Sequence, residues 1–391
     1  MLHKPVILVF TGRYLPGYKA GGILRNIINT VDFLGDDFEF RIVTRDRDLG
    51  DEVGYMNVKV DEWQRVGNAY VYYLSQGAET LKAIFDLIKE TQHDVIFLTS
   101  YFDPLTIKTL ANIKNRKFTF SPVIVAPFGE FAWASLRQKF LKKLIFIILA
   151  RLVGLYKGVI WRVSSSYEAV DLIHVMNISE KSVFITGDLP IKTLPQLKPL
   201  LVVDNTDSSL RLLKIIFLSR ISREKNLHIA LKILHKVQAS VLFDIYGPVE
   251  NRSYWAECQA LIAEVPANVT VRYCGDVHPN KVLEVFSSYD LFLFPSGGEA
   301  YGNVIAEALI VGTPVLISTL TPWRDLQSNG MGWDIELSNI NAFVSVIEDI
   351  ALQSEYQHLN MRRLIQRKIL GRLFDPDVLE SNRRLFASQI K

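Results

Sequence analysis

The feature that most constrains the fold is the alternation of short apolar runs with stretches of helical periodicity. In the first half these runs span residues 5–10, 38–43, 94–98, 122–126, 158–163 and 182–186, with helical patterns at 22–34 and 79–91. In the second half they span residues 214–218, 241–246, 269–274, 290–294 and 314–318. Such runs are typical of buried parallel strands with helices on both faces. We therefore expect an α/β chain built from βα units.

The length predicts two domains. A chain of 391 residues with 49% hydrophobic residues exceeds one ordinary core, given a prior of roughly 150 residues per domain. Periodicity is lost over residues 189–209, which collect Pro190, Pro195 and Pro199. This stretch is the expected linker, and it places the domains at residues 1–198 and 199–370. Open α/β sheets bind ligands at the carboxyl ends of their strands, so we expect two Rossmann-like, doubly wound domains that face a cleft.

Composition excludes several classes. The formal charge of +3 does not favour a nucleic-acid partner. Cys258 and Cys274 have no CxxC spacing, and we expect both to be buried in a reducing compartment. The first apolar run is too short for a signal peptide, and no stretch reaches the roughly 18 apolar residues of a membrane span. The seven histidines show no metal-ligand cluster. We therefore expect a cytoplasmic protein with no metal or other cofactor.

The segment PSGGEAYGNVIAEA, residues 295–308, follows a buried run and combines a Gly-rich loop with two carboxylates. We expect Glu299 in the loop, Asn303 as the helix N-cap and Glu307 one turn inside the helix. The N–H groups at the helix start would then meet an anion, and a carboxylate on either side suits sugar hydroxyls. The alternative is a glutamate that favours the helix dipole and a second, solvent-exposed one.

Cations follow the run at 214–218. In FLSRISREKNL, Arg220 and Lys225 stand just past the strand end, where two positive charges can neutralise a diphosphate. Solvated charges in a polar loop are the alternative. The neighbouring Arg223 and Glu224 could pair locally with each other and are weaker candidates.

The first strand is followed by a Gly-rich loop, VFTGRYLPGYKAGGILRNI, at residues 9–27. Its Gly21 and Gly22 would let backbone N–H groups approach a phosphate or sugar closely. The spacing is not G-x-G-x-x-G, so a dinucleotide site is only weakly supported. A flexible turn is the alternative.

Two further stretches carry charge. TRDRD at residues 44–48 contains a D-x-D, which we interpret as an acceptor-side or structural loop because two carboxylates alone make a poor Mg²⁺ site. The stretch Leu136–Gly158 combines six Lys and Arg residues with the apolar run LIFIILA. It suits either a helix on an anionic membrane surface or a core helix with a basic edge.

Several segments of the second domain together resemble one family. SRISREKNL, YGP (246–248), YCGDV (273–277), DLFLFPSGGEAYGNVIAEALIVGTPVLIS and TPWRDL (321–326) occur in the order seen in family-four retaining glycosyltransferases of the GT-B fold. In the first domain, PGYKAGGILRNI, VTRDRDLGD and PFGEF resemble bacterial members that build cell-surface polysaccharides. The resemblance covers nearly all of the second domain.

The resemblance implies a metal-independent transfer of a sugar from a nucleotide-sugar to a saccharide or polyprenyl-linked acceptor, with retained anomeric configuration. Arg220 and Lys225 would hold the donor diphosphate, Glu299 the donor sugar and Glu307 the ribose. Further donor contacts would come from Gly21, Gly22, Tyr246, Gly247, Asp276, Val277, Ala300, Tyr301, Gly302, Asn303 and Val304. Residues 371–391 would form a C-terminal helix that packs back on the first domain.

The chain departs from the family pattern at two positions. Phe128 stands where many relatives carry His or Arg, and Arg162 stands where similar sequences often show His. Since Phe128 cannot hydrogen-bond a hydroxyl, Glu130 is the expected substitute, and both, with Arg25, are expected to face sugar or acceptor. Glu299 as a nucleophile is an alternative to donor binding. Other possible functions are a nucleotide-sugar epimerase or hydrolase of the same fold, or a catalytically silent binding subunit.

Overall fold

The chain divides into two compact units. The first comprises Met1–Lys192 and Asp375–Lys391, and the second comprises Thr193–Phe374. The computed structural model describes residues 4–116, 121–192 and 212–390. Most of the predicted linker at 189–209, and the predicted boundary at 198/199, therefore lie outside the described residues.

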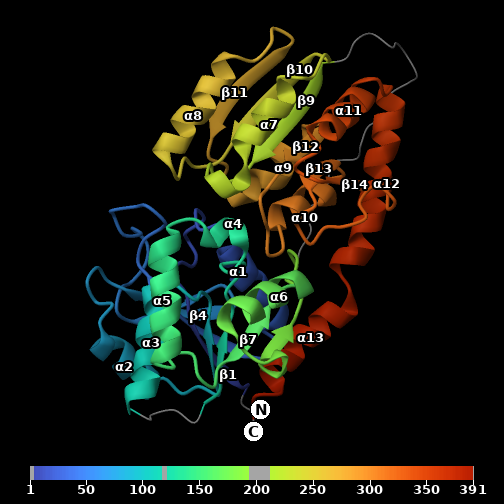
Figure 1. The fold of residues 1–391 in the computed structure, drawn as a ribbon. Coiled ribbons are helices and arrows are strands. Elements are labelled where there is room, and N and C mark those ends of the chain that lie inside the picture. The colour runs from blue at the N-terminus through green and yellow to red at the C-terminus, as the bar shows by residue number, and fades with distance from the viewer. Residues whose placement is uncertain (1–3, 117–120, 193–211, 391) are drawn as a thin grey trace. The chain divides into compact units, whose positions relative to one another are not determined.

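The first unit is built on an eight-stranded sheet within the described residues, in the order β3-β4-β2-β1-β5-β6-β7-β8. Figure 1 labels its strands β1, β4 and β7. All neighbours run parallel except β3 and β4, which form an antiparallel pair. The strands are β1 (Val6–Phe10), β2 (Glu39–Arg45), β3 (Trp63–Val66), β4 (Ala69–Leu74), β5 (Val95–Leu98), β6 (Val123–Val125), β7 (Ile160–Val163) and β8 (Val183–Ile185). The six predicted strands are confirmed, whereas β3 and β4 were missed.

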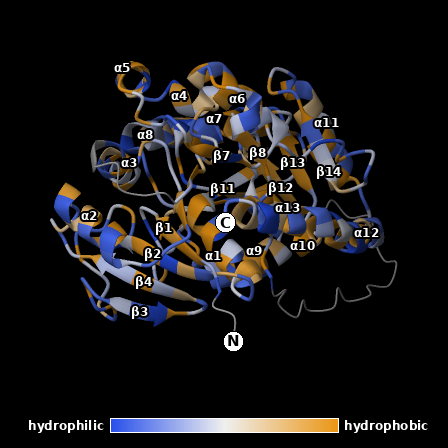
Figure 2. Ribbon diagram, turned by 90° about the horizontal axis from the view of Figure 1, so that it is seen from below, coloured by the Kyte–Doolittle hydropathy of each residue, from blue (hydrophilic) through white to orange (hydrophobic). Residues whose placement is uncertain are grey.

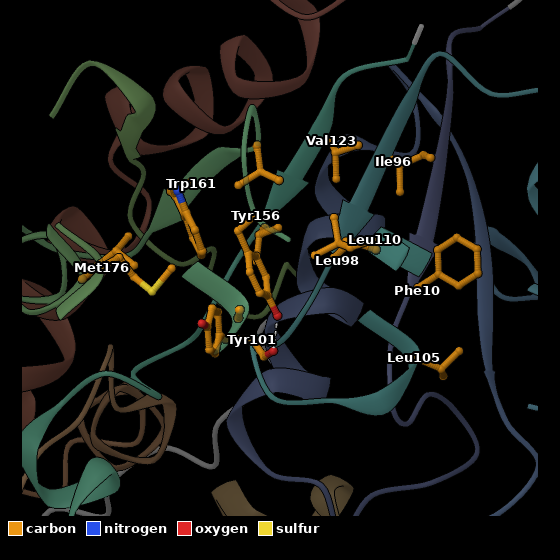
Figure 3. Close-up of a cluster of buried hydrophobic side chains, with 14 of the residues drawn as sticks. Phe10, Ile96, Leu98, Tyr101, Leu105, Leu110, Val123, Tyr156, Trp161 and Met176 are labelled. Atoms are coloured by element: carbon orange, nitrogen blue, oxygen red, sulfur yellow. Dashed lines mark hydrogen bonds between the residues drawn. The ribbon is translucent and has the colours of Figure 1, made fainter. Parts of the chain in front are cut away.

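Helices cover both faces of this sheet. They are α1 (Gly22–Leu34), α2 (Leu81–Glu90), α3 (Pro104–Arg116), α4 (Trp133–Leu136), α5 (Phe140–Leu152), α6 (Ser166–Met176) and α13 (Pro376–Ala387). On β1, Leu8 and Phe10 join a buried cluster with residues of α2, α3, α5 and α6, part of which Figure 3 shows. Ile7 and Val9 join a second cluster with residues of α1 and α13. Because alternate β1 residues enter different clusters, both sheet faces are buried and the unit is doubly wound.

The C-terminal helix α13 packs into the first unit. The Phe386 ring makes edge-to-face contacts with Phe38, Phe40 and Phe97, at centroid distances of 5.5–6.1 Å. At the surface, Arg383 Nε lies 2.9 Å from Asp37 Oδ2. These contacts make α13 part of the first unit's core, although α12 (Glu355–Leu373), just before it, belongs to the second unit.

The second unit contains a six-stranded sheet with only parallel neighbours in its described part, in the order β11-β10-β9-β12-β13-β14. Its strands are β9 (Leu213–Leu218), β10 (Val241–Tyr246), β11 (Val269–Gly275), β12 (Leu291–Phe294), β13 (Val315–Ser318) and β14 (Gly332–Ile335). Its other helices are α7 (Leu227–Leu234), α8 (Arg252–Ala263), α9 (Val282–Ser287), α10 (Asn303–Ile310) and α11 (Ile340–Ala351). Five strands match the prediction, and β14 was missed. Since the strands are parallel, the loops that follow β9 to β12 all leave the same sheet edge.

Candidate functional site

Two loops at this edge are tied together by hydrogen bonds. The loop between β9 and α7 lies beside the loop between β12 and α10, because β9 and β12 are neighbouring strands. Gly297 N donates to Glu224 O at 2.7 Å, and Asn226 Nδ2 donates to Pro295 O at 2.9 Å. The two segments that the sequence singled out therefore form one structural unit.

Lys225 and Glu299 form an ion pair between these loops. Lys225 Nζ lies 2.6 Å from Glu299 Oε1, and Ser296 Oγ donates to the same oxygen at 2.7 Å. Their side chains are only 14% and 12% exposed. Lys225 Nζ also lies 5.8 Å from the centroid of the Phe294 ring. Sequence reasoning gave these residues separate roles toward a donor, whereas the structure pairs them with each other.

Arg220 lies in the same loop and is more accessible. Its Nη1 contacts Glu250 Oε2 at 2.5 Å, and its Nη2 lies 3.6 Å from Glu224 Oε1. Burial of the Glu224 carboxyl opposes ionisation, but hydrogen bonds, first from Ser222, and nearby cations outweigh it and lower its pKa. Arg223 pairs with Glu257 at 2.5 Å instead. The structure thus gives Arg223 and Glu224 other partners than the local pair that the sequence allowed.

The start of α10 is set by a glycine. Gly302 is the N-cap, with φ of 85°, and Asn303 is the first helical residue, so the prediction of Asn303 as N-cap is wrong. A Cβ at Gly302 would lie 2.8 Å from Ile305 Cδ1, and the left-handed backbone itself disfavours other residues. Trp323 Nε1 donates to Tyr301 O at 2.7 Å, which anchors the loop. The start of α10 is thus held in place at the end of the loop that carries Glu299.

The remaining predicted donor residues of α10 and its loop are only partly accessible. Ala300, Tyr301, Asn303, Val304 and Glu307 are each half-buried. Glu307 stands in the second turn of α10, so its predicted position one turn inside the helix is confirmed.

Gly247 allows a close backbone contact between neighbouring loops. A Cβ at this position would lie 1.9 Å from Ser219 O, and its φ is 129°. Gly247 N donates to Gly275 O at 2.8 Å, and Ile221 N donates to Pro248 O at 2.9 Å. The loops after β9, β10 and β11 therefore depend on the absence of a side chain here.

The predicted nucleoside residues divide into two groups. The Tyr246 hydroxyl lies 3.1 Å from the Tyr289 hydroxyl, which donates to Asp244 Oδ2 at 2.6 Å. Tyr246 thus belongs to a polar network inside the unit. Asp276 is exposed and Val277 is half-buried, and both follow β11. Both therefore stand in the loop that leaves the carboxyl end of β11.

The first unit carries the predicted sugar-facing and acceptor-facing residues. Gly21 is the N-cap of α1 with φ of 68°, Gly22 is its first residue, and Arg25 N donates to Gly21 O at 3.2 Å. Phe128 follows β6 with a positive φ of 47°. The Arg162 guanidinium carbon lies 5.2 Å from the Phe128 ring centroid. Arg162 also forms a buried ion pair of 2.7 Å with Asp188.

Two carboxyl groups, of the half-buried Glu130 and the buried Glu168, form hydrogen bonds around the Phe128 loop. Glu130 accepts from Ser100 Oγ at 2.6 Å and from Tyr101 N at 2.5 Å. Burial raises its pKa to about 7, although these hydrogen bonds act in the opposite direction. Glu168 accepts from Gly129 N at 2.5 Å and from Ser164 Oγ at 2.7 Å, and burial raises its pKa as well. Glu130 therefore binds Ser100 and Tyr101 in the loop that follows β5, and its expected contact with substrate stays a prediction.

Glu168 was missed from the sequence. The local signal was SSSYE, in which Ser165 caps α6 by accepting from Glu168 N at 3.2 Å. That pattern predicts a helix start. It does not predict that the glutamate side chain reaches a loop 39 residues earlier.

The D-x-D stretch has a structural role. Asp48 accepts from the backbone N–H groups of Tyr18, Lys19 and Leu49, at 2.7–3.3 Å, and Asp46 pairs with Arg47. The carboxylate of Asp48 thus holds the Gly-rich loop. Across the described residues, no group of three or more His, Cys, Asp or Glu side chains is arranged to hold a metal ion. Of the two cysteines, Cys258 is buried and Cys274 is exposed, so the expectation for Cys274 is wrong.

Comparison with solved structures identifies the fold. The chain is similar to Anabaena HepE, solved with UDP and glucose, at 14% identity, covering 98% of this chain and 99% of that chain with a TM-score of 0.67. It is similar to WaaG, a glycosyltransferase of lipopolysaccharide biosynthesis, at 14% identity, 98% and 99% coverage and a TM-score of 0.62. It is also similar to sucrose-phosphate synthase from Thermosynechococcus elongatus, at 15% identity, 98% and 100% coverage and a TM-score of 0.68. These likenesses, over two α/β units with parallel sheets, give the chain the GT-B fold.

Comparison with protein families identifies the class of the second unit. Residues 206–366 match the family described as glycosyl transferases group 1. A sequence comparison with characterised proteins finds no match. The chain therefore carries a group 1 glycosyl transferase domain and is an enzyme of the glycosyltransferase class.

Proposed function

We propose that this chain is a retaining glycosyltransferase that moves a sugar from a nucleotide-sugar to a hydroxyl of a saccharide or polyprenyl-linked saccharide, in the synthesis of a cell-surface polysaccharide. The observation that carries the proposal is the pair of tied loops after β9 and β12. They bring Lys225 Nζ within 2.6 Å of Glu299 and place Arg220 in the same loop. The solved complexes of HepE with UDP and with UDP-glucose support a nucleotide-sugar donor.

The chemistry follows from charge. Breaking the bond between an anomeric carbon and a diphosphate leaves a diphosphate anion and an oxocarbenium-like sugar. Arg220, Lys225 and the N–H groups at the start of α10 would stabilise the leaving diphosphate. These groups supply the positive charge from the chain itself, so we propose that the transfer needs no metal. The acceptor hydroxyl would attack from the face that the diphosphate leaves, and the leaving phosphate would take its proton.

On this proposal Glu299 and Glu307 bind different parts of the donor. Glu299 lies beside Lys225 and would accept hydrogen bonds from hydroxyls of the transferred sugar. Glu307, one turn into α10, would accept from the ribose. A polyprenyl-linked acceptor implies work at a membrane surface, so we also propose that the protein associates peripherally with the inner face of the plasma membrane.

A thermal-shift screen of nucleoside diphosphates and nucleotide-sugars tests the donor. A ligand that binds only the folded state raises the melting temperature by mass action. The donor found in this way is then incubated with polyprenyl-linked and soluble saccharides, with and without a chelator, and the anomeric configuration of the product is read by NMR. Retention of configuration with unchanged activity in chelator is expected.

Two other functions give different results in the same assays. An epimerase or hydrolase of this fold would convert the donor with no acceptor present. A silent binding subunit would show the thermal shift and no product with any acceptor. A chain in which no nucleotide-sugar shifts the melting temperature would contradict the proposal.

A further inference from the structure

The helix α5 exposes an unusually apolar surface. Leu152 is 78% exposed, Leu141 71% and Ile145 57%, and Ile148, Leu149 and Val153 are each about half exposed. These six residues form what we call the apolar face. In Figure 2 the hydrophobic residues of α5 appear in orange beside hydrophilic ones in blue. Five large aliphatic side chains on one helix, with Val153 at its C-cap, exceed the scattered exposure that is normal for a protein surface.

The opposite side of α5 is anchored in the core of the first unit. Ile147 and Ala150 are buried in the cluster that contains Tyr101 and Tyr156. The Tyr156 ring stacks on Tyr101 at 4.3 Å, and its hydroxyl donates to Tyr101 O at 2.5 Å (Figure 3). The apolar face is therefore held outward by a well-packed helix, and its exposure does not result from a loose segment.

The charged residues of the segment that carries the apolar face have one sign. Residues 136–158 contain six Lys and Arg residues and no Asp or Glu. Lys139, Lys142, Arg151 and Lys157 are exposed, and Lys139 and Lys142 flank the start of α5. Trp133, 68% exposed on α4, contacts Phe140 edge-to-face at a centroid distance of 6.3 Å. An aliphatic stripe with an adjacent tryptophan and surrounding cations matches the apolar boundary and anionic headgroups of a bilayer.

We infer that the apolar face of α5 docks onto the surface of an anionic lipid bilayer. The helix lies in the interface, with its aliphatic side chains among the acyl chains and its cations at the headgroups. No helix in the described part of the chain is long and apolar enough to cross a membrane, which fits a helix lying on the surface. A second copy of this chain is a poorer occupant, because the same cations would meet each other. The assignment of the surface stands on exposure and charge, whereas its purpose, access to a lipid-linked acceptor, rests on the proposed function.

Vesicle binding tests the inference directly. The full chain is floated with vesicles of phosphatidylcholine, with and without phosphatidylglycerol. The variant L141S/I145S/L152S is expected to bind anionic vesicles at least about tenfold more weakly, because its apolar insertion is lost. The control V53S/M56S/L352S, at positions 77%, 94% and 80% exposed elsewhere, is expected to bind as the wild type does.

Charge is tested separately. K142E/R151E is expected to weaken binding to anionic vesicles by roughly fivefold or more per cation replaced. K82E/K89E, at exposed lysines of α2, is the control and is expected to have little effect. Acyl chains brominated near the headgroup should quench Trp133, and a W133F variant identifies its share of the signal.

Several results would overturn the inference: no preference for anionic vesicles, equal losses in the control variants, or a dimer in solution that L141S/I145S/L152S abolishes while vesicle binding persists. Transfer to a water-soluble acceptor is measured in the same variants and is expected to be unchanged. Vesicle binding without any transfer would contradict the proposed function and leave the docking surface intact.

Discussion

Replacing Glu299 is expected to have opposite effects on donor binding and on catalysis. In the structure Glu299 is the partner of Lys225, at 2.6 Å. A diphosphate that binds Lys225 must take the place of this carboxylate or share the lysine with it. In Glu299→Gln the amide oxygen still accepts from Ser296 Oγ, but Lys225 loses its anionic partner. We therefore expect this variant to bind nucleoside diphosphates more tightly and to transfer sugar more slowly.

The size of the effect follows from the geometry of the pair. Two unit charges 2.6 Å apart attract by about 6 kcal/mol at an effective dielectric constant of about 20. Desolvation offsets much of this attraction, and a hydrogen bond between charged groups contributes about 1.5–3 kcal/mol net. Since about 1.4 kcal/mol is tenfold in affinity, Glu299→Gln should lower the Kd for a nucleoside diphosphate by about tenfold. Loss of the sugar contact should lower kcat by about a hundredfold.

A double-mutant cycle by isothermal titration calorimetry measures the coupling. Lys225→Met should raise the Kd by at least about tenfold, through loss of a charge-assisted hydrogen bond. Adding Glu299→Gln to Lys225→Met should then change the Kd little, because there is no lysine left to release. If Glu299→Gln weakens diphosphate binding as much as Lys225→Met does, competition within the pair is refuted.

Three further predictions concern stability. Gly247→Ala should lower the free energy of unfolding by about 3 kcal/mol and weaken diphosphate binding. Gly275→Ala, with φ of 75° and no atom within 4 Å of the added Cβ, should lower it by only about 1 kcal/mol. Urea unfolding of both variants separates the steric clash from the backbone strain. The pKa of Glu130 is raised to about 7, so the folded state holds its proton more strongly, and this carboxyl's contribution to stability falls as pH rises from about 4.5 to 7. Glu130→Gln should remove about 1–3 kcal/mol of that loss. If the free energy of unfolding changes with pH equally in both proteins, the prediction is contradicted. Phe386→Ala should destabilise the first unit by about 3–5 kcal/mol in the same urea assay. Leu370→Ala, at an exposed position of α12, is the control and should not affect that unit.

The sequence predicted strands well where both faces of the strand are buried. Phe292 and its neighbours in β12 form a continuous apolar run, and so do the residues of β1. The missed strands have mixed environments. In β4 Tyr70 is 42% exposed, and β14 is largely half-buried after Gly332. The sequences of β3 (WQRV) and β14 (GWDI) are short and lack a continuous apolar run, so their pairing with β4 and β13 reveals them. The sequence of β4 (AYVYYL) is such a run and was overlooked.

The sequence also predicted which residues reach the edge of the second sheet, because in a parallel sheet the loop after each strand must leave at the carboxyl end. It did not predict which side chains pair there. Lys225 and Glu299 are 74 residues apart, and the alternatives of a ligand contact and an internal ion pair use the same residue types. Tyr246 shows the same limit, since it is the last residue of β10 while its hydroxyl contacts that of Tyr289. The loop in which a residue lies follows from the sheet topology. The side chain with which it pairs follows from side-chain rotamers and from packing between neighbouring strands.

The pairing of Lys225 with Glu299 also bears on how the proposed transfer would be ordered. Two side chains so little exposed need partners, because an unpaired charge at a part-buried site is unfavourable. In the free protein each provides the other's partner. If a diphosphate takes Lys225, Glu299 loses its cation, and hydroxyls of the attached sugar are then its nearest compensating donors. A nucleotide-sugar satisfies both groups at once, whereas a nucleoside diphosphate satisfies only Lys225 and leaves Glu299 with the hydrogen bond from Ser296 Oγ but with no group in place of Lys225. On the proposed function, the same pair that neutralises the empty site would therefore favour the intact donor over the spent one.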